Sequence, residues 1–150
     1  MSKKYILKSI NGGANIDRAI IINLNNTNNV QDMGIHITVC FLENIPQNIF
    51  DNLNKTIKNE FNSSIQNTTW NLTFTNQWVK SWEVTAVNQR GVSIESYRKA
   101  IFEYIKENAK KYISTARYAD GYPPMHVDVS KFIYTPAVNK TFNKLNLYIR

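Results

Sequence analysis

The two histidines of the chain, His36 and His126, each begin a short segment in which polar and apolar residues alternate. Residues 36–39 read His-Ile-Thr-Val, and residues 126–129 read His-Val-Asp-Val. Alternating segments of this kind predict strands, and side chains two positions apart lie on the same face of a strand. Each histidine is therefore expected to share a strand face with an oxygen-bearing side chain, Thr38 in the first segment and Asp128 in the second.

Two imidazoles suit the cleavage of a phosphodiester. One takes the proton from the attacking oxygen and the other gives a proton to the leaving oxygen, because histidine ordinarily titrates near ~6.5. The Thr38 hydroxyl, ~7 Å along the same face, can donate a hydrogen bond to a phosphate oxygen as negative charge builds up. This chemistry needs no metal or cofactor, and we expect neither, since the sequence has no ligand cluster at standard metal spacing.

A single strand histidine is more often a structural residue, but the repeated pattern favours the functional interpretation. Strict alternation places Cys40 on the face of His36 and Thr38, and it places Phe41 on the opposite, core-forming face. A free cysteine in a strand is usually a small buried side chain. We therefore do not assign Cys40 as a nucleophile.

The hydrophobic pattern predicts an α+β domain in which each half runs strand, helix, strand. Turns are expected at 11–13 and 88–91, and loops at 25–29 and 114–125. Helices are expected at about 46–61, with Pro46 in the first turn, and over about 97–112. Strands are expected at 5–10, 19–24, 35–42, 70–75, 79–87, 126–132 and 145–149.

The length of 150 residues predicts one domain, 1–150. A net charge of +7 favours polyanionic partners, and the single cysteine argues against a disulfide framework. No apolar run approaches a membrane span, and the N-terminus lacks the apolar segment of a signal peptide. We therefore expect a cytoplasmic chain without membrane attachment. The bias towards Asn, Ile and Lys is typical of AT-rich genomes, including viral ones, in which case the host cytoplasm is meant.

The paired motifs, their order and the proline-containing loop before the second one resemble the 2H phosphoesterases, also called LigT-like or cyclic-phosphodiesterase-like proteins. The signature of that family is a pair of His-x-Thr/Ser-x motifs on strands, in which x is apolar. The resemblance covers nearly the whole chain and implies a bilobal fold: two antiparallel-sheet lobes with helices outside and a central cleft. It also implies that His36 and His126 are the general acid and base, in an order left open, and that Thr38 donates to phosphate.

Asp128 departs from this signature, because it stands where the family has Thr or Ser. An ionised carboxylate repels phosphate, most strongly in a dry cleft. Asp128 can instead orient His126, contact a ribose hydroxyl or a base, or mark a weakened or inactive site. Ser130 lies on the same strand face and is a substitute donor.

The resemblance implies a small nucleotide or oligonucleotide as substrate. We favour a messenger, either 2′,5′-oligoadenylate or a cyclic di- or trinucleotide, because no appended RNA-binding segment is visible; viral and phage members of the family degrade such messengers to blunt host immunity. The alternatives are a 2′,3′-cyclic phosphodiesterase of RNA or nucleotide metabolism, an inactive nucleotide-binding domain, and a basic interaction module. No obligate protein partner is expected. Aromatic and basic side chains provide candidate platforms for bases and phosphates: Trp78, Trp82, Tyr118, Tyr122, Arg117 and Lys131.

Overall fold

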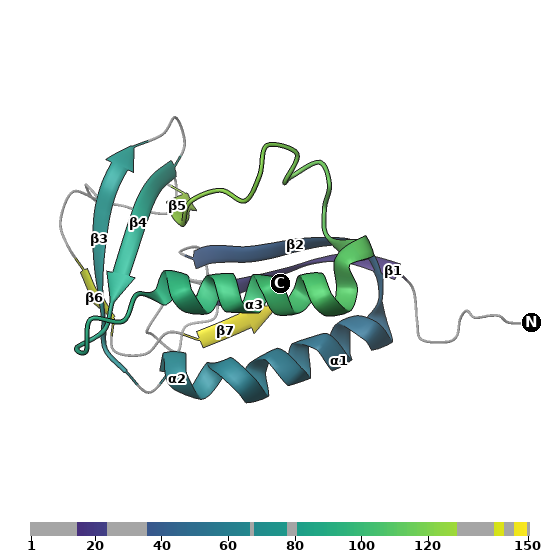
Figure 1. The fold of residues 1–150 in the computed structure, drawn as a ribbon, viewed down its shortest axis with the longest axis horizontal. Coiled ribbons are helices and arrows are strands. Elements are labelled where there is room, and N and C mark those ends of the chain that lie inside the picture. Colours follow the sequence, from purple (N-terminus) through teal and green to yellow (C-terminus); the bar gives the residue numbers. More distant parts are fainter. Residues whose placement is uncertain are drawn as a thin grey trace, which may run out of the picture.

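The computed structural model describes residues 15–23, 36–66, 68–77, 81–128, 140–142 and 146–149. Only the backbone is described at Gln77, Asp128, 140–142 and 146–149. Within these residues the chain has the expected α+β architecture, with two antiparallel sheets and two long helical segments (Figure 1). None of the helices in this part of the chain is long and apolar enough to cross a membrane.

The first sheet has the strand order β2-β1-β7 and the second has the order β5-β4-β3-β6. Every pairing within the two sheets is antiparallel. The strands are β1 (Asn15–Asn23), β2 (His36–Pro46), β3 (Trp70–Gln77), β4 (Ser81–Val87), β5 (His126–Asp128), β6 (Lys140–Phe142) and β7 (Asn146–Ile149).

The first helical segment runs without a break from α1 (Gln47–Ile57) through a π-helical turn (Lys58–Asn62) into α2 (Ser63–Gln66). Phe50, Leu53 and Ile57 recur at helical spacing and are buried, which explains why α1 packs on one face. Pro46 lies at the N-cap position just before the helix, rather than in its first turn.

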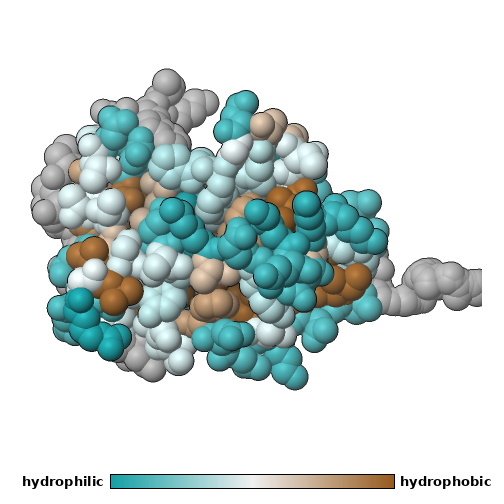
Figure 2. Space-filling model, viewed as in Figure 1, coloured by the Kyte–Doolittle hydropathy of each residue, from teal (hydrophilic) through white to brown (hydrophobic). Residues whose placement is uncertain are grey.

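The second helix, α3 (Ile94–Ala109), ends in a short 3₁₀ turn (Lys110–Tyr112). It begins where the Ser93 hydroxyl accepts a hydrogen bond from the Glu95 N–H, which satisfies one unpaired donor at the helix start. Helix α3 contacts both β2 of the first sheet and β4 of the second. The side of α3 that faces outward is mainly hydrophilic (Figure 2). The opposite face is buried and packs against both sheets, so this one helix connects them.

A β-bulge in β2 overturns the strict alternation expected over residues 35–42. Ile20 of β1 pairs with Cys40 and the next residue, Ile21, pairs with Thr38, so Val39 has no partner of its own. Val39 and Cys40 are consequently both fully buried in the core. The prediction that Cys40 shares the face of His36 is wrong, and so is the prediction that Phe41 faces the core.

The remaining elements follow the sequence closely. The strand expected at 19–24 begins earlier, at Asn15, and the strand expected at 35–42 extends to Pro46. The turn at 88–91 is present, with Gly91 at a φ of 80° that favours glycine. Strand β6 was not anticipated. The strand expected at 5–10, the turn at 11–13 and the loop at 25–29 lie outside the described residues.

Candidate active site

The two histidine motifs lie on the outer strands of different sheets. Strand β2, which begins at His36, is at one edge of the first sheet, and β5, which begins at His126, is at one edge of the second. These two edge strands contact each other. Two segments 90 positions apart in the sequence (126 minus 36) are therefore brought together where the sheets meet.

Each histidine lines one of two adjoining pockets. His36 lines a pocket of about 440 Å³, and His126 lines a smaller one of about 140 Å³. Both pockets share the side chains of Thr38, Phe41 and Arg117. Thr38 and Phe41 come to one surface because the bulge at Val39 shifts the alternation by one residue. A hydroxyl and a guanidinium thus lie between the two imidazoles.

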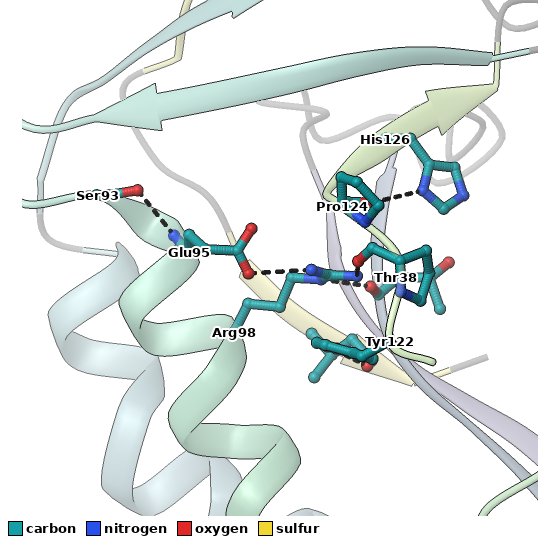
Figure 3. A network of polar contacts seen from close by, with 9 residues as sticks. Thr38, Ser93, Glu95, Arg98, Tyr122, Pro124 and His126 are labelled. Carbon is teal, nitrogen blue, oxygen red and sulfur yellow. Dashed lines mark hydrogen bonds and ion pairs between the residues drawn. The ribbon is translucent and has the colours of Figure 1, made fainter. Parts of the chain in front are cut away.

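The His126 imidazole is oriented by the loop that leads to it. Its Nδ1 lies 2.9 Å from the carbonyl oxygen of Pro124 (Figure 3). Because a carbonyl oxygen can only accept, Nδ1 carries the proton, and in the neutral ring Nε2 is the basic nitrogen. His126 pairs across the sheet with Glu83, whose carboxylate accepts a hydrogen bond of 3.0 Å from the Asn76 side chain.

Arg117 is placed between the pockets by a short chain of contacts. Its guanidinium carbon lies 3.9 Å from the centre of the Phe41 ring, within the range of a cation–π contact. The backbone N–H of Arg117 donates to the Ser114 hydroxyl at 3.2 Å, and that hydroxyl in turn donates to the Glu43 carboxylate at 2.7 Å. Arg117 is exposed and lines both pockets, so its charge is accessible to a ligand in either one.

The outer edge of β2 is covered by the segment that follows α3. The Tyr118 hydroxyl accepts from the Phe41 N–H at 2.9 Å, and the Tyr122 hydroxyl donates to the Val39 carbonyl at 2.6 Å. The Ser114 N–H donates to the Phe41 carbonyl at 3.0 Å. These bonds replace those of a further strand, so the loop satisfies an edge that would otherwise leave polar groups unpaired.

Burial keeps the thiol of Cys40 and the phenol groups of Tyr118 and Tyr122 protonated. Burial raises the pKa of the Cys40 thiol to about 12, which the hydrogen bond from Tyr118 offsets only in part. Burial likewise raises the pKa of Tyr118 to about 12. Burial also raises the pKa of Tyr122 although the Arg98 guanidinium opposes the shift. Cys40 is thus a buried thiol without nucleophilic character.

Only some of the residues predicted to bind substrate line the two pockets. Arg117 and Tyr118 line the smaller pocket. Tyr122 lines neither of these two pockets, because its ring stacks on Phe102 at 4.0 Å and its hydroxyl is bonded to β2.

Trp82 lies on the wrong face of its sheet to serve as a platform beside His126. It pairs with Val127, which is buried in the core, whereas Glu83 pairs with His126. Since neighbouring residues of a strand face opposite ways, Trp82 points to the core side and packs against Phe74. The side chain of Asp128, and residues Trp78, Ser130 and Lys131, lie outside what the structure describes.

Sequence reasoning missed Arg98, and of the charged residues that line the larger pocket it found only Arg117. Arg98 is 1% exposed and donates hydrogen bonds to both motif regions. The sequence did contain a signal for Arg98, because this arginine falls on the stripe of α3 whose other buried residues, Ile94, Ile101, Ile105 and Ala109, are apolar. The charged side chains lining the larger pocket are Asp17, Arg18, Glu43 and Arg117.

Comparisons with protein-family models, with curated proteins and with solved structures gave no significant match to this chain. Among the residues that the structure describes, no three His, Cys, Asp or Glu side chains are grouped as metal ligands would be.

Proposed function

We propose that this chain is a metal-independent phosphodiesterase of the 2H phosphoesterase kind, which cleaves a small nucleotide messenger by two-histidine acid–base catalysis. The proposal rests mainly on one observation: His36 and His126 line adjoining pockets that share Thr38, Phe41 and Arg117. Such convergence of two distant motifs is unexpected if the histidines are unrelated structural residues. The two sheets whose edge strands meet there are consistent with the two lobes of that family.

The side chains between the histidines have the properties that this reaction needs. Thr38 offers a hydroxyl and Arg117 a guanidinium to the non-bridging phosphate oxygens, and both interactions strengthen as charge develops. The fixed tautomer of His126 directs Nε2, rather than Nδ1, to the reacting oxygen as base, or as acid once the ring is protonated. His36 then takes the complementary role.

The two pockets differ in what they can hold. A volume of about 440 Å³ beside His36 falls in the usual range for small-molecule sites, whereas about 140 Å³ beside His126 is below it. We therefore place a nucleoside of the substrate on the His36 side and the phosphate near Thr38 and Arg117. Candidate substrates are 2′,5′-oligoadenylate and cyclic di- or trinucleotides; in a virus-infected cell, cleaving them in the cytoplasm would counter antiviral signalling.

Two alternatives use the same site. A 2′,3′-cyclic phosphodiesterase of RNA or nucleotide metabolism would need the same histidines but a smaller substrate. An inactive nucleotide-binding domain would follow if Asp128, in place of Thr or Ser, repels the phosphate of the transition state. Turnover that appears only in Asp128→Thr would favour the second alternative.

The direct test is a cleavage assay in EDTA with four substrate classes: 2′,5′-oligoadenylate, a cyclic dinucleotide, a cyclic trinucleotide and a 2′,3′-cyclic nucleotide. A general acid or base typically contributes roughly 10²–10⁴-fold to the rate. We therefore expect kcat to fall by at least about 10²-fold in His36→Ala and in His126→Ala. Circular dichroism should show both variants folded. Activity that survives in either variant, or that depends on added metal, would contradict the proposal.

Arg117 gives a second test with a matched control. Arg117→Gln removes the charge shared by the two pockets and should raise KM by about tenfold, the range of one charge-assisted hydrogen bond to phosphate. Arg90 is also exposed and lies in the turn between β4 and α3, so Arg90→Gln removes the same charge elsewhere. Equal effects of the two substitutions, measured at several salt concentrations, would show only general charge steering.

A further inference from the structure

Arg98 of α3 is a buried cation between the two motifs. Its guanidinium donates three hydrogen bonds: Nε to the Thr38 carbonyl at 3.1 Å, Nη2 to the Pro123 carbonyl at 2.8 Å, and Nη1 to the Glu95 carboxylate at 3.0 Å (Figure 3). Its side chain is 2% exposed. A buried charge in this setting is costly unless it is fully hydrogen-bonded, and here the three bonds use three different directions of the planar fork.

The partners of Arg98 belong to the candidate site. Thr38 is in the first motif and carries the proposed phosphate donor. Pro123 lies three residues before His126 and directly before Pro124, whose carbonyl holds the His126 imidazole. Proline fixes its own φ and restricts the residue before it. The pair Pro123–Pro124 is therefore a stiff connection, and holding the first carbonyl constrains the direction of the second.

A second contact strengthens the same connection. The guanidinium carbon of Arg98 lies 4.1 Å from the centre of the Tyr122 ring, and the Tyr122 hydroxyl bonds the Val39 carbonyl at the bulge. One side chain of α3 thus reaches β2 directly and through Tyr122, and it reaches the loop before β5.

We infer that Arg98 is a positioning residue: it sets the distance between Thr38 and His126 and fixes His126 in the tautomer with the proton on Nδ1. The inference rests on the proposed function for its catalytic consequence but not for its structural one. Arg98 is among the residues that line the smaller pocket, but its side chain is 2% exposed and its guanidinium is already bonded to the Thr38 and Pro123 carbonyls and the Glu95 carboxylate. It therefore acts through the backbone and does not replace the exposed Arg117 as the phosphate ligand. Small errors in placing catalytic groups cost rates of about 10²-fold.

The test combines kinetics with a spectroscopic measurement. In Arg98→Met, kcat should fall by about 10²-fold while KM changes less than about threefold, because positioning affects the transition state more than substrate binding. Arg98→Lys keeps the charge but cannot form the fork, and it should lose about tenfold in kcat. Ile105→Ala is the matched control: Ile105 is buried in the same helix, so the variant lowers the melting temperature without removing any hydrogen bond of Arg98, and its kcat should stay within about twofold.

The tautomer of His126 is read from long-range ¹⁵N–¹H correlation spectra at about pH 8.5, well above the ordinary titration of histidine. With two histidines in the chain, His36→Gln assigns the signals. The wild type should show Nδ1 protonated; Arg98→Lys and Arg98→Met should show a mixture of tautomers, and Ile105→Ala should resemble the wild type. A folded Arg98→Lys with an unchanged tautomer and unchanged kcat would overturn the inference.

The spectra separate this inference from the proposed function. If the wild type cleaves none of the four substrates, the proposed function fails, and a tautomer that changes in Arg98→Lys still supports the role of Arg98. If the wild type is active but the tautomer and kcat of Arg98→Lys are unchanged, only the inference fails. If Arg98→Met does not fold, Arg98→Lys carries the same comparison.

Discussion

Tyr122→Phe tests whether the bulge of β2 depends on the loop that covers it. The substitution removes the hydroxyl that donates to the Val39 carbonyl at 2.6 Å, while the ring can keep its stacking on Phe102 and Arg98. A hydrogen bond of this kind contributes about 0.5–1.5 kcal/mol, and a buried carbonyl left without a donor costs about 1–3 kcal/mol. We therefore expect the free energy of unfolding to fall by about 1–3 kcal/mol.

The assay is urea unfolding followed by tryptophan fluorescence. A lower midpoint with an unchanged slope would report lost stability rather than a changed unfolded state. In a domain of this size each kcal/mol corresponds to about 2–4 °C in melting temperature. Tyr104→Phe is the matched control, because Tyr104 lies half-buried on α3 and its hydroxyl forms no hydrogen bond with the described residues; it should change stability by less than about 0.5 kcal/mol.

Equal stability of the wild type and Tyr122→Phe would refute this reasoning, because the Val39 carbonyl would then be satisfied in another way. An equal loss in Tyr122→Phe and Tyr104→Phe would also refute it, since the effect would belong to any tyrosine hydroxyl of the fold. A loss confined to Tyr122→Phe would show that the loop bond stabilises the bulge.

Two further predictions concern the buried acidic groups. Since burial raises the pKa of Cys40 from 9.0 to about 12, its thiolate fraction at about pH 8 is roughly a thousandfold below that of an ordinary thiol; alkylation by iodoacetamide should be correspondingly slow and accelerate on unfolding, and rapid alkylation of the folded chain would contradict the burial. The pKa values of Cys40, Tyr118 and Tyr122 are raised in the folded chain, so their contribution to stability is complete below about pH 9 and is lost as the pH rises towards 12. Urea midpoints should therefore fall across that window, and less steeply in Tyr122→Phe; a midpoint independent of pH there would count against the shifts.

Much of the fold could be predicted because its elements have strong local patterns. The buried stripe of α1 and the alternation of β3 and β4 are periodic over many residues, β1 contains a run of apolar, β-branched residues, and turn residues separate these elements. Strand β6 has only three residues, Lys140–Phe142, and pairs with β3 across a wide gap in the sequence. No local signal distinguishes such a short segment from a loop. It is a strand only because it pairs with β3 in the folded chain.

The bulge at Val39 shows where local reasoning fails within a correctly predicted strand. Alternation predicts Cys40 beside Thr38, but one unpaired residue reverses the faces from that point onward. The bulge is stabilised by Tyr118 and Tyr122, which lie about 80 positions later. A single segment of sequence contains no information about such a partner.

The sequence by itself determined the two histidine motifs, the strands that carry them, the loop before the second motif and the chemistry that the side chains permit. These properties depend on residue type and on spacing over a few positions, and both can be read directly from the sequence. Tertiary structure alone decided that β2 and β5 meet as edge strands and that Phe41 and Arg117 line both pockets together with Thr38. It also decided that Trp82 faces the core and lines neither of these two pockets. It also revealed Arg98 as the link between the motifs, because the meaning of a buried charge depends on which distant carbonyls surround it.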